Sequence, residues 1–260
     1  MYIAPPNNFI YCSYKVTVRF ADEIGNQPVC RGTGFYLAAG DSVVFVTNRH
    51  VLDPMYEKTD VHESMRLVEN RILGKTNQGE TYELIVDPNQ PVLFPDNYED
   101  DVACIVNPQG QFTKGNTVVF YHFGVETLAN EYLFSEGLYP GDRIYYAGFP
   151  DPYDKLAQRP ILRSGTIASD PRHPYSNTGK DEGARIAYEG FSSGGASGSP
   201  IWAAARGFLG APGAREGSII GVNAGHIDQK FGAHSGISFF YKSTVVLALL
   251  RKHGIIEKAL

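Results

Sequence analysis

The segment Gly194-Gly195-Ala196-Ser197-Gly198-Ser199-Pro200 is the most informative stretch of the chain, because it places Ser197 among glycines just before an apolar run. A serine at a glycine-rich turn that enters a strand can expose its hydroxyl while neighbouring backbone N–H groups converge on one point. That combination is typical of a nucleophile beside an oxyanion-binding turn. The alternative interpretation is a flexible Gly/Ser loop without a chemical role.

Two residues upstream of this turn are the partners that a nucleophilic serine requires. A serine hydroxyl is a weak nucleophile at neutral pH and needs a positioned base, commonly a histidine that a buried carboxylate orients. His50 follows the apolar run 43–46, and Asp101 directly precedes the apolar run 102–106. Asp100 is the competing carboxylate. We prefer Asp101 because it adjoins the predicted strand, where a buried carboxylate can be fixed.

The composition predicts a globular protein built mostly of short strands. Of its 260 residues, 43% are hydrophobic and 20% are charged, which is enough apolar material for a core and too little charge for a disordered chain. The 28 glycines and 16 prolines indicate many turns. Period-two alternation from Lys15 to Phe20 places Val16, Val18 and Phe20 on one face of a half-buried strand.

Strand signals recur along the chain, and a helix signal stands at its end. The runs 32–37 and 42–47 flank the turn residues Ala39-Gly40-Asp41 and predict a hairpin. After Ser243-Thr244, which can cap a helix, apolar residues recur at helical spacing as far as Leu250. Further strands are expected over 64–73, 81–86, 102–106, 117–122, 142–148, 161–168, 185–188, 200–202, 218–223 and 236–241.

A set of short motifs follows the order and spacing of one enzyme family. The motifs are Gly32-Thr33-Gly34-Phe35, Thr47-Asn48-Arg49-His50-Val51, Asp101-Val102-Ala103, Pro140-Gly141-Asp142 with Gly148-Phe149-Pro150, Gly165-Thr166-Ile167, the serine turn, and Gly221-Val222-Asn223. In these motifs the chain resembles the trypsin-like (chymotrypsin-fold) serine proteases, and their bacterial HtrA and glutamyl-endopeptidase branches more than the digestive enzymes. The resemblance implies an all-β fold of two six-stranded antiparallel β-barrels, 1–112 with His50 and Asp101 and 113–260 with Ser197 and the C-terminal helix.

The resemblance also implies a role for each candidate residue. It makes Ser197 the nucleophile, His50 the general base and then acid, and Asp101 the carboxylate that holds the imidazole tautomer. The backbone N–H groups of Gly195 and Ser197 would form the oxyanion hole. Alignment from Ser197 places the substrate-binding pocket at Phe191, Ser192, Asn223, Ala224, Gly225 and His226, with 236–238 along its walls.

The pocket residues limit the substrates that we expect. Trypsin's pocket aspartate is missing, so cleavage after Lys or Arg is disfavoured, because the cation would stay unpaired in a partly desolvated slot. Glutamyl endopeptidases have a histidine where this chain has Asn223, and His226 is the candidate substitute. We favour an apolar or small side chain before the scissile bond.

Three departures from the family pattern bear on the site. Val51 stands where trypsin has a cysteine disulfide-bonded to one near the place of Cys30, so that bridge is absent, consistent with a reducing compartment. Ala196 replaces the aspartate that pairs with a newly cleaved amino terminus in the digestive enzymes, so activation by that route is not required. Ala224 replaces the serine that usually supports the triad aspartate.

Charge and cysteine content exclude other classes of protein. A net charge of −5 with a pI near 5.8 provides no basic field for nucleic acid. Without a signal peptide or a long apolar run we expect a cytoplasmic protein with no membrane partner. Three widely spaced cysteines indicate buried thiols. No histidine shows metal-ligand spacing, and no cofactor is expected. The expected partner is a protein or peptide substrate. An upstream activator or regulatory protein is also compatible with the sequence.

Two alternative functions remain open at this level. Gly190-Phe191-Ser192-Ser193-Gly194 formally matches the nucleophile elbow of α/β-hydrolases, which would make Ser192 the nucleophile of an esterase with Asp228 and a later histidine. The second alternative is a catalytically silent protease-fold module that binds an extended peptide by strand addition.

Overall fold

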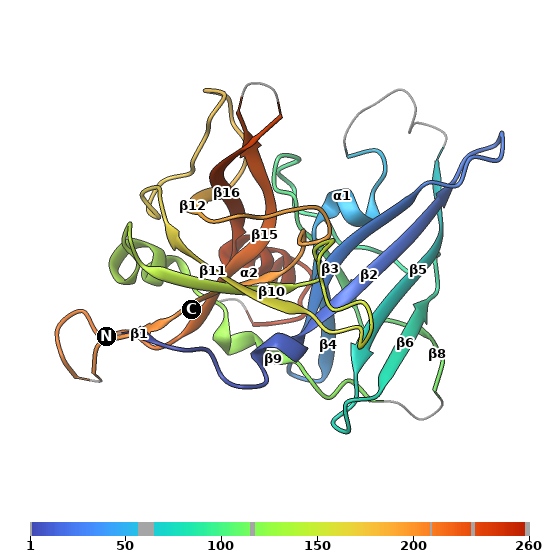
Figure 1. The fold of residues 1–260 in the computed structure, drawn as a ribbon, viewed down its shortest axis with the longest axis horizontal. Coiled ribbons are helices and arrows are strands. Elements are labelled where there is room, and N and C mark those ends of the chain that lie inside the picture. The colour runs from blue at the N-terminus through green and yellow to red at the C-terminus, as the bar shows by residue number, and fades with distance from the viewer. Residues whose placement is uncertain (1, 57–64, 115–117, 209, 230–231, 258–260) are drawn as a thin grey trace.

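The computed structural model describes residues 2–56, 65–114, 118–208, 210–229 and 232–257. Two β structures lie side by side: a curled sheet built from the amino-terminal half and a closed barrel built from the carboxy-terminal half (Figure 1). The predicted chymotrypsin-like, all-β fold with a C-terminal helix is confirmed.

The amino-terminal half is a sheet with the strand order β7-β4-β3-β2-β5-β6-β8, and β9 pairs in parallel with β3. It curls like a barrel but does not close in the part of the chain that the structure describes. β7 and β8, only four and three residues long, pair with β4 and β6 and not with each other. The strands are β2 (Ser13–Ala21), β3 (Val29–Ala39), β4 (Ser42–Thr47), β5 (Arg66–Lys75), β6 (Thr81–Val86), β7 (Ala103–Val106), β8 (Gly110–Phe112) and β9 (Phe123–Gly124).

The carboxy-terminal half forms the expected six-stranded barrel, in the order β10-β11-β12-β16-β15-β13, with every pairing antiparallel. A short two-stranded sheet of β1 (Tyr2–Ile3) and β14 (Ala205–Arg206) lies beside it. The barrel strands are β10 (Arg143–Gly148), β11 (Ile161–Ile167), β12 (Arg185–Glu189), β13 (Pro200–Ala203), β15 (Ser218–Asp228) and β16 (His234–Lys242).

Among the residues that the structure describes, the helical elements are short except for the last one. They are η1 (Phe9–Cys12), α1 (Arg49–Leu52), η3 (Val125–Thr127), η4 (Leu133–Gly137) and α2 (Ser243–Lys252). The helix expected at the end of the chain is confirmed as α2, but Ser243 does not cap it. Its hydroxyl instead donates a hydrogen bond to the carbonyl of Ala129 at 2.7 Å, which fixes the start of the helix to the barrel.

One expected strand is wrong. Residue 117 of the predicted 117–122 strand lies outside the described residues, and 118–122 form no strand. This segment connects the two halves. It reaches the sheet only after residue 122, where β9 pairs with β3 over two residues. The β-branched and aromatic residues of this segment therefore do not mark a sheet position, and Val118 and Phe120 are exposed.

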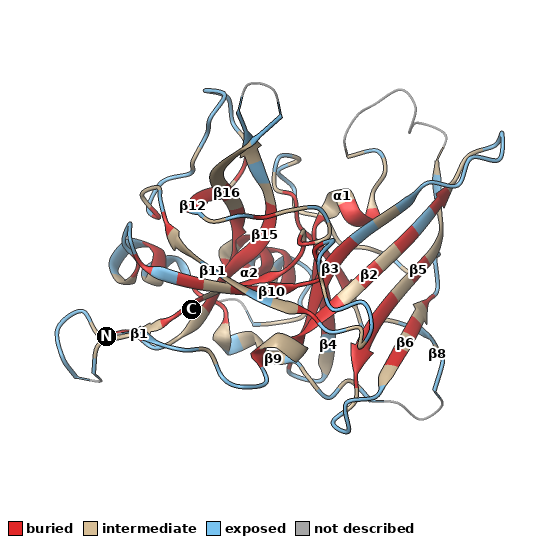
Figure 2. Ribbon diagram, in the orientation of Figure 1, coloured by how far each residue is buried: buried red, intermediate tan, exposed pale blue. Residues whose placement is uncertain are grey.

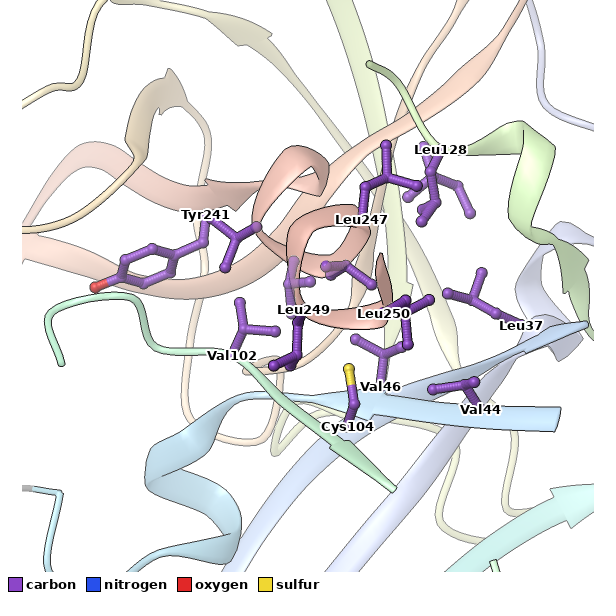
Figure 3. Close-up of a cluster of buried hydrophobic side chains, with 14 of the residues drawn as sticks. Leu37, Val44, Val46, Val102, Cys104, Leu128, Tyr241, Leu247, Leu249 and Leu250 are labelled. Atoms are coloured by element: carbon purple, nitrogen blue, oxygen red, sulfur yellow. The ribbon is translucent and has the colours of Figure 1, made fainter. Parts of the chain in front are cut away.

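The core is shared by both halves. Val16, Val18 and Phe20 are buried on one face of β2 as predicted, and buried positions line the interior of both β structures (Figure 2). Helix α2 packs Leu249 and Leu250 into a cluster with Val46 of β4 and Cys104 of β7 (Figure 3). The same cluster contains residues of β15 and β16, so α2 covers the junction between the sheet and the barrel.

Two of the three thiols are structural. Cys12 and Cys104 are buried, and burial raises the pKa of each to about 12, so both stay protonated at neutral pH. Cys30 is only half-buried, which departs from the expectation of burial for all three. Within the described ranges, no helix is long and apolar enough to cross a membrane.

Candidate active site

His50 and Asp101 come together where the ends of β4 and the segment before β7 meet. Helix α1 begins directly after β4, and the carboxylate of Asp101 lies against its first turn. Oδ2 of Asp101 is 2.6 Å from Nδ1 of His50, and Oδ1 accepts the backbone N–H of His50 at 2.9 Å. The Asn48 side chain donates to the carbonyl of Asp101 at 2.6 Å. The Asp101 carboxylate is therefore held by the backbone N–H of His50, and the Asp101 backbone is held by the Asn48 side chain.

The Asp101 carboxylate is buried in a site of low solvent exposure. The residue is only 5% exposed. Burial and the negative charge of Asp101 both raise the pKa of Tyr56 and of Tyr241 well above the ordinary value. Tyr56 also raises the pKa of Tyr241, whereas the hydrogen bond with Tyr241 lowers that of Tyr56. A charge held in such surroundings interacts strongly with the imidazole beside it.

Asp100, the competing carboxylate, faces away from the histidine. Its Oδ1 accepts the backbone N–H of Ala184 at 2.7 Å, which joins the segment before β7 to the start of β12. Burial raises the pKa of Asp100, with a smaller contribution in the same direction from nearby acidic groups. Asp100 therefore ties the two halves together, whereas Asp101 contacts the imidazole.

Ser197 lies on a turn just before β13 begins, and this turn is hydrogen-bonded to β15. The N–H of Gly198 donates to the carbonyl of Asn223 at 2.7 Å, and the N–H of Asn223 donates to the carbonyl of Ser199 at 2.9 Å. The Ser197 hydroxyl donates to the carbonyl of Ala224 at 2.9 Å. The predicted serine turn and the β15 segment of the predicted pocket thus form one hydrogen-bonded unit.

The peptide groups around Ser197 point in defined directions. The carbonyl of Gly194 accepts from the N–H of Asp151 at 3.1 Å, and the carbonyl of Ala196 accepts from the Asn223 side chain at 3.0 Å. In a trans peptide the C=O and the N–H point opposite ways. The N–H groups of Gly195 and Ser197, which belong to these two peptides, therefore point away from those partners.

These two N–H groups are unpaired donors. Across the residues that the structure describes, neither N–H donates a hydrogen bond. Gly195 has a φ of +87°, and a Cβ there would lie 2.4 Å from the carbonyl oxygen of Phe149, so only glycine fits this position. Two unpaired donors beside a serine hydroxyl are what the stabilisation of a developing oxyanion requires.

The predicted pocket residues divide into an exposed and a buried set. Phe191 is 62% exposed and His226 is exposed, whereas Ser192, Asn223 and Ala224 are buried, and Gly225 is half-buried. The Asn223 side chain accepts from the Tyr188 hydroxyl at 2.7 Å and donates to the Ser192 hydroxyl at 2.9 Å. The Asn223 amide is therefore fully used within the protein. It stabilises the pocket wall and presents no polar atom to a substrate side chain.

Sequence analysis missed two residues at this site. Asn48 holds the backbone of Asp101, and only its place two residues before His50 could have indicated it. His234, at the start of β16, stacks on His226 with a ring-centroid distance of 4.6 Å and lies 4.7 Å from the ring of Phe191. Burial and the neighbouring His226 lower the pKa of His234, so it is mainly neutral at pH 7. Its pairing across the β15–β16 hairpin was not visible in the sequence.

The esterase alternative is wrong. The fold is all-β, without the strand–turn–helix that a nucleophile elbow needs. Ser192 is buried, its N–H donates to the Ser238 hydroxyl at 3.0 Å, and its own hydroxyl accepts from Asn223. Within the described ranges, no group of three or more His, Cys, Asp or Glu side chains is placed to hold a metal ion.

A chymotrypsin-like double β structure with a serine turn and a His–Asp pair at its junction defines the class of trypsin-like peptidases. The family model described as the trypsin-like peptidase domain matches residues 32–210, and the chain belongs to this family. It is therefore a trypsin-like protease.

The structural comparison agrees at the level of the fold. The crystal structure of the protease Anisep from Arthrobacter nicotinovorans matches with a TM-score of 0.54 and 16% sequence identity, over 94% of this chain and 95% of that chain. A search of curated protein sequences finds no match. At this identity the likeness to Anisep shows a common fold alone.

Proposed function

We propose that this protease is a serine endopeptidase that hydrolyses peptide bonds through His50, Asp101 and Ser197 by way of an acyl-enzyme intermediate. The observation that carries the proposal is the 2.6 Å contact between Nδ1 of His50 and Oδ2 of Asp101, combined with a serine turn whose two N–H groups donate to no described residue. Each part has a defined task in acyl transfer.

The contacts of the site set the order of the proton transfers. Asp101 accepts a hydrogen bond from Nδ1, so the neutral imidazole carries its proton there and leaves the lone pair of Nε2 to accept the Ser197 proton. Attack of Oγ on the substrate carbonyl forms an O–C bond and places negative charge on the former carbonyl oxygen. The N–H groups of Gly195 and Ser197 stabilise this oxyanion, each contributing about 2.7–4 kcal/mol.

In the later steps His50 acts first as an acid and then again as a base. His50 gives its proton to the leaving amine as the C–N bond breaks, and a water molecule then attacks the acyl-enzyme while His50 accepts the water's proton. Before the first step the Ser197 hydroxyl must turn from the carbonyl of Ala224 towards Nε2. Such a rotation is ordinary, because catalytic hydrogen bonds often tighten only when substrate is bound.

The substrate is a protein or peptide, and we propose that the pocket accepts a small or apolar side chain. Ser192 and Asn223 are neutral and hydrogen-bonded to each other, so the buried part of the pocket wall holds no charge to pair with a cationic side chain. The Asp228 carboxylate lies at the exposed side, 3.1 Å from Nε2 of His226. Phe191 and the stacked histidines His226 and His234 narrow the exposed side. The boundary at residue 112, the cytoplasmic location and the upstream activator stay predictions.

The replacement Ser197→Ala tests the proposal. A hydroxyl-directed fluorophosphonate should label the native protein and not the variant, and hydrolysis of a peptide library should fall by about 10⁴- to 10⁶-fold. The fold should persist, because the side chain makes only one hydrogen bond, to a carbonyl. Ser192→Ala is the matched control for the identity of the nucleophile and should keep fluorophosphonate labelling, because Ser192 belongs to the predicted pocket wall and is not the attacking hydroxyl. Full hydrolysis by Ser197→Ala would refute the assignment, and an unlabelled native protein would indicate a silent peptide-binding module.

A further inference from the structure

Thr33 makes hydrogen bonds to two segments, the serine turn and the segment after β10. It is fully buried on β3 of the amino-terminal sheet. Its N–H donates to the carbonyl of Ser197 at 2.7 Å, which links β3 to the turn through the backbone. Its hydroxyl donates to the carbonyl of Gly195 at 2.8 Å and accepts the N–H of Phe149 at 3.0 Å. One side-chain oxygen therefore joins the turn and the segment after β10.

The two bonds of the Thr33 hydroxyl restrain the glycine that supplies an oxyanion donor. Gly194 and Gly195 are adjacent glycines, so the peptide between them can rotate at low steric cost unless other groups hold it. The carbonyl of Gly195 is held by Thr33, and the carbonyl of Gly194 is held by the N–H of Asp151. With a peptide group fixed on each side, the φ and ψ angles of Gly195 are fixed, and so is the direction of its N–H.

The same hydroxyl positions the segment against which Gly195 packs. The carbonyl oxygen of Phe149 lies 2.4 Å from where a Cβ of Gly195 would be, so this segment limits the movement of the turn. The N–H of Phe149 donates to Thr33, and the N–H of Asp151, two residues on, holds the Gly194 peptide. Thr33 thus acts on the Gly194–Gly195 peptide from both sides.

In the part of the chain that the structure describes, no ionic contact holds the serine turn. The residue before the nucleophile is Ala196, which is buried and apolar. Three hydrogen bonds hold the turn instead: Asp151, Thr33 and Asn223 donate to the successive carbonyls of residues 194, 195 and 196. Because Thr33 alone of the three comes from the amino-terminal half, it also ties the donors to the half that carries His50 and Asp101.

We propose that the Thr33 hydroxyl is a positioning group for the oxyanion hole, which orients the N–H of Gly195 without touching the substrate. The inference rests on the proposed function of Ser197. A hydroxyl is required because the group must donate to Gly195 and accept from Phe149 at the same time, which serine can also do and valine cannot.

The experiment compares Thr33→Val and Thr33→Ser with Ser13→Ala as the matched control. Ser13 is also buried, and its hydroxyl donates to the carbonyl of Ala147 on β10 at 2.9 Å, so it crosses the same junction without reaching the turn. The readouts are kcat, KM, the rate of fluorophosphonate labelling, and the affinity of a peptide aldehyde, whose hemiacetal oxygen occupies the oxyanion hole. The thermal midpoint of each variant is measured alongside.

Thr33→Val should lower kcat by about 10- to 100-fold, less than the loss of a whole oxyanion donor, and should weaken aldehyde binding by a similar factor. KM should change by less than about threefold, because the contact acts in the transition state. Thr33→Ser should restore kcat to within about threefold of the native value, and Ser13→Ala should leave kcat within about threefold while lowering the thermal midpoint.

Equal losses of kcat in Thr33→Val and Ser13→Ala, or unchanged aldehyde affinity in Thr33→Val, would overturn the inference. If Thr33→Val does not fold, Thr33→Cys replaces it, because a thiol is a weak donor and should give an intermediate loss of kcat. A native protein that fluorophosphonate does not label refutes the proposed function itself. Labelling of native protein and Thr33→Val at the same rate refutes only the role of Thr33.

Discussion

Asp101→Asn replaces the carboxylate beside His50 with an amide whose orientation the structure dictates. The backbone N–H of His50 donates to Oδ1 of Asp101 at 2.9 Å, so this position must keep an acceptor. The amide oxygen of asparagine therefore faces the backbone, and its NH₂ group faces Nδ1 of the imidazole. Nδ1 then has to accept a hydrogen bond, and the imidazole proton moves to Nε2. A protonated Nε2 cannot take the proton of Ser197.

The expected size of the effect follows from this tautomer. With Nε2 protonated the general base is lost while the oxyanion hole and the substrate pocket stay intact, so kcat should fall by about 10⁴-fold with little change in KM. The assay is steady-state hydrolysis of a peptide substrate at about pH 7.5. Labelling of Ser197 by fluorophosphonate should slow by a similar factor, because it needs the same proton transfer.

The matched control is Asp100→Asn, one residue away. Its amide oxygen can still accept the N–H of Ala184, and the side chain does not contact His50, so kcat should stay within about threefold of the native value. If Asp100→Asn were the more damaging change, the third member of the site would be misplaced. If Asp101→Asn kept more than about one-tenth of the native turnover, the reasoning from the tautomer would be refuted.

Three further predictions concern pH and the turn. Activity should rise with pH between about 6 and 8 as His50 loses its proton, and a flat pH–rate profile there would contradict a histidine base. Burial raises the pKa of Asp100, so its ionised form opposes folding above that pKa; Asp100→Asn should raise the thermal midpoint at pH 7, and the gain should shrink as the pH falls towards 4. A gain that grew on acidification would reverse this sign. Gly198→Ala should destabilise the fold by about 1–3 kcal/mol from its φ of +89° alone, and by more because its Cβ would lie 1.8 Å from the carbonyl of Thr33. Gly179→Ala, with a φ of +75° in open space, should cost only the backbone strain in the same denaturant titration.

The strands that the sequence predicts well are those with strong local patterns. The alternation from Lys15 to Phe20 is part of β2, the expected 81–86 strand coincides with β6, and the hairpin at Gly40 joins β3 to β4. In each case the period of side-chain burial is set within the strand and its neighbour in sequence. The open edge of the amino-terminal sheet was not predictable in this way, because it depends on the short β7 and β8, which pair with distant strands and not with each other.

The residues of the candidate site also fall into those that the sequence predicts and those that only the structure shows. His50, Asp101 and Ser197 are chemically distinctive residues in recognisable motifs, so their positions could be proposed from the sequence. Asn48 and Thr33 act through contacts with residues 53 and 162 positions away, and His234 acts across a hairpin. The residue types of all three are ordinary. Asn223 was placed at the pocket, but only the structure shows that its amide is fully used by Tyr188 and Ser192.

The position of α2 has a consequence for the synthesis of the protein. Its side chains Val246, Leu249 and Leu250 are buried against strands of both halves, and each such burial contributes about 1.5–3 kcal/mol. A ribosome makes the chain from the amino terminus, so the sheet and the barrel exist before the helix that covers their junction has emerged. Until Lys252 has left the exit tunnel, the nascent chain lacks this part of its core, and the two halves are held together without it by contacts such as those of Asp100 and Thr33. Contacts that fix the half carrying His50 to the half carrying Ser197 are therefore made by a helix that is synthesised after both residues.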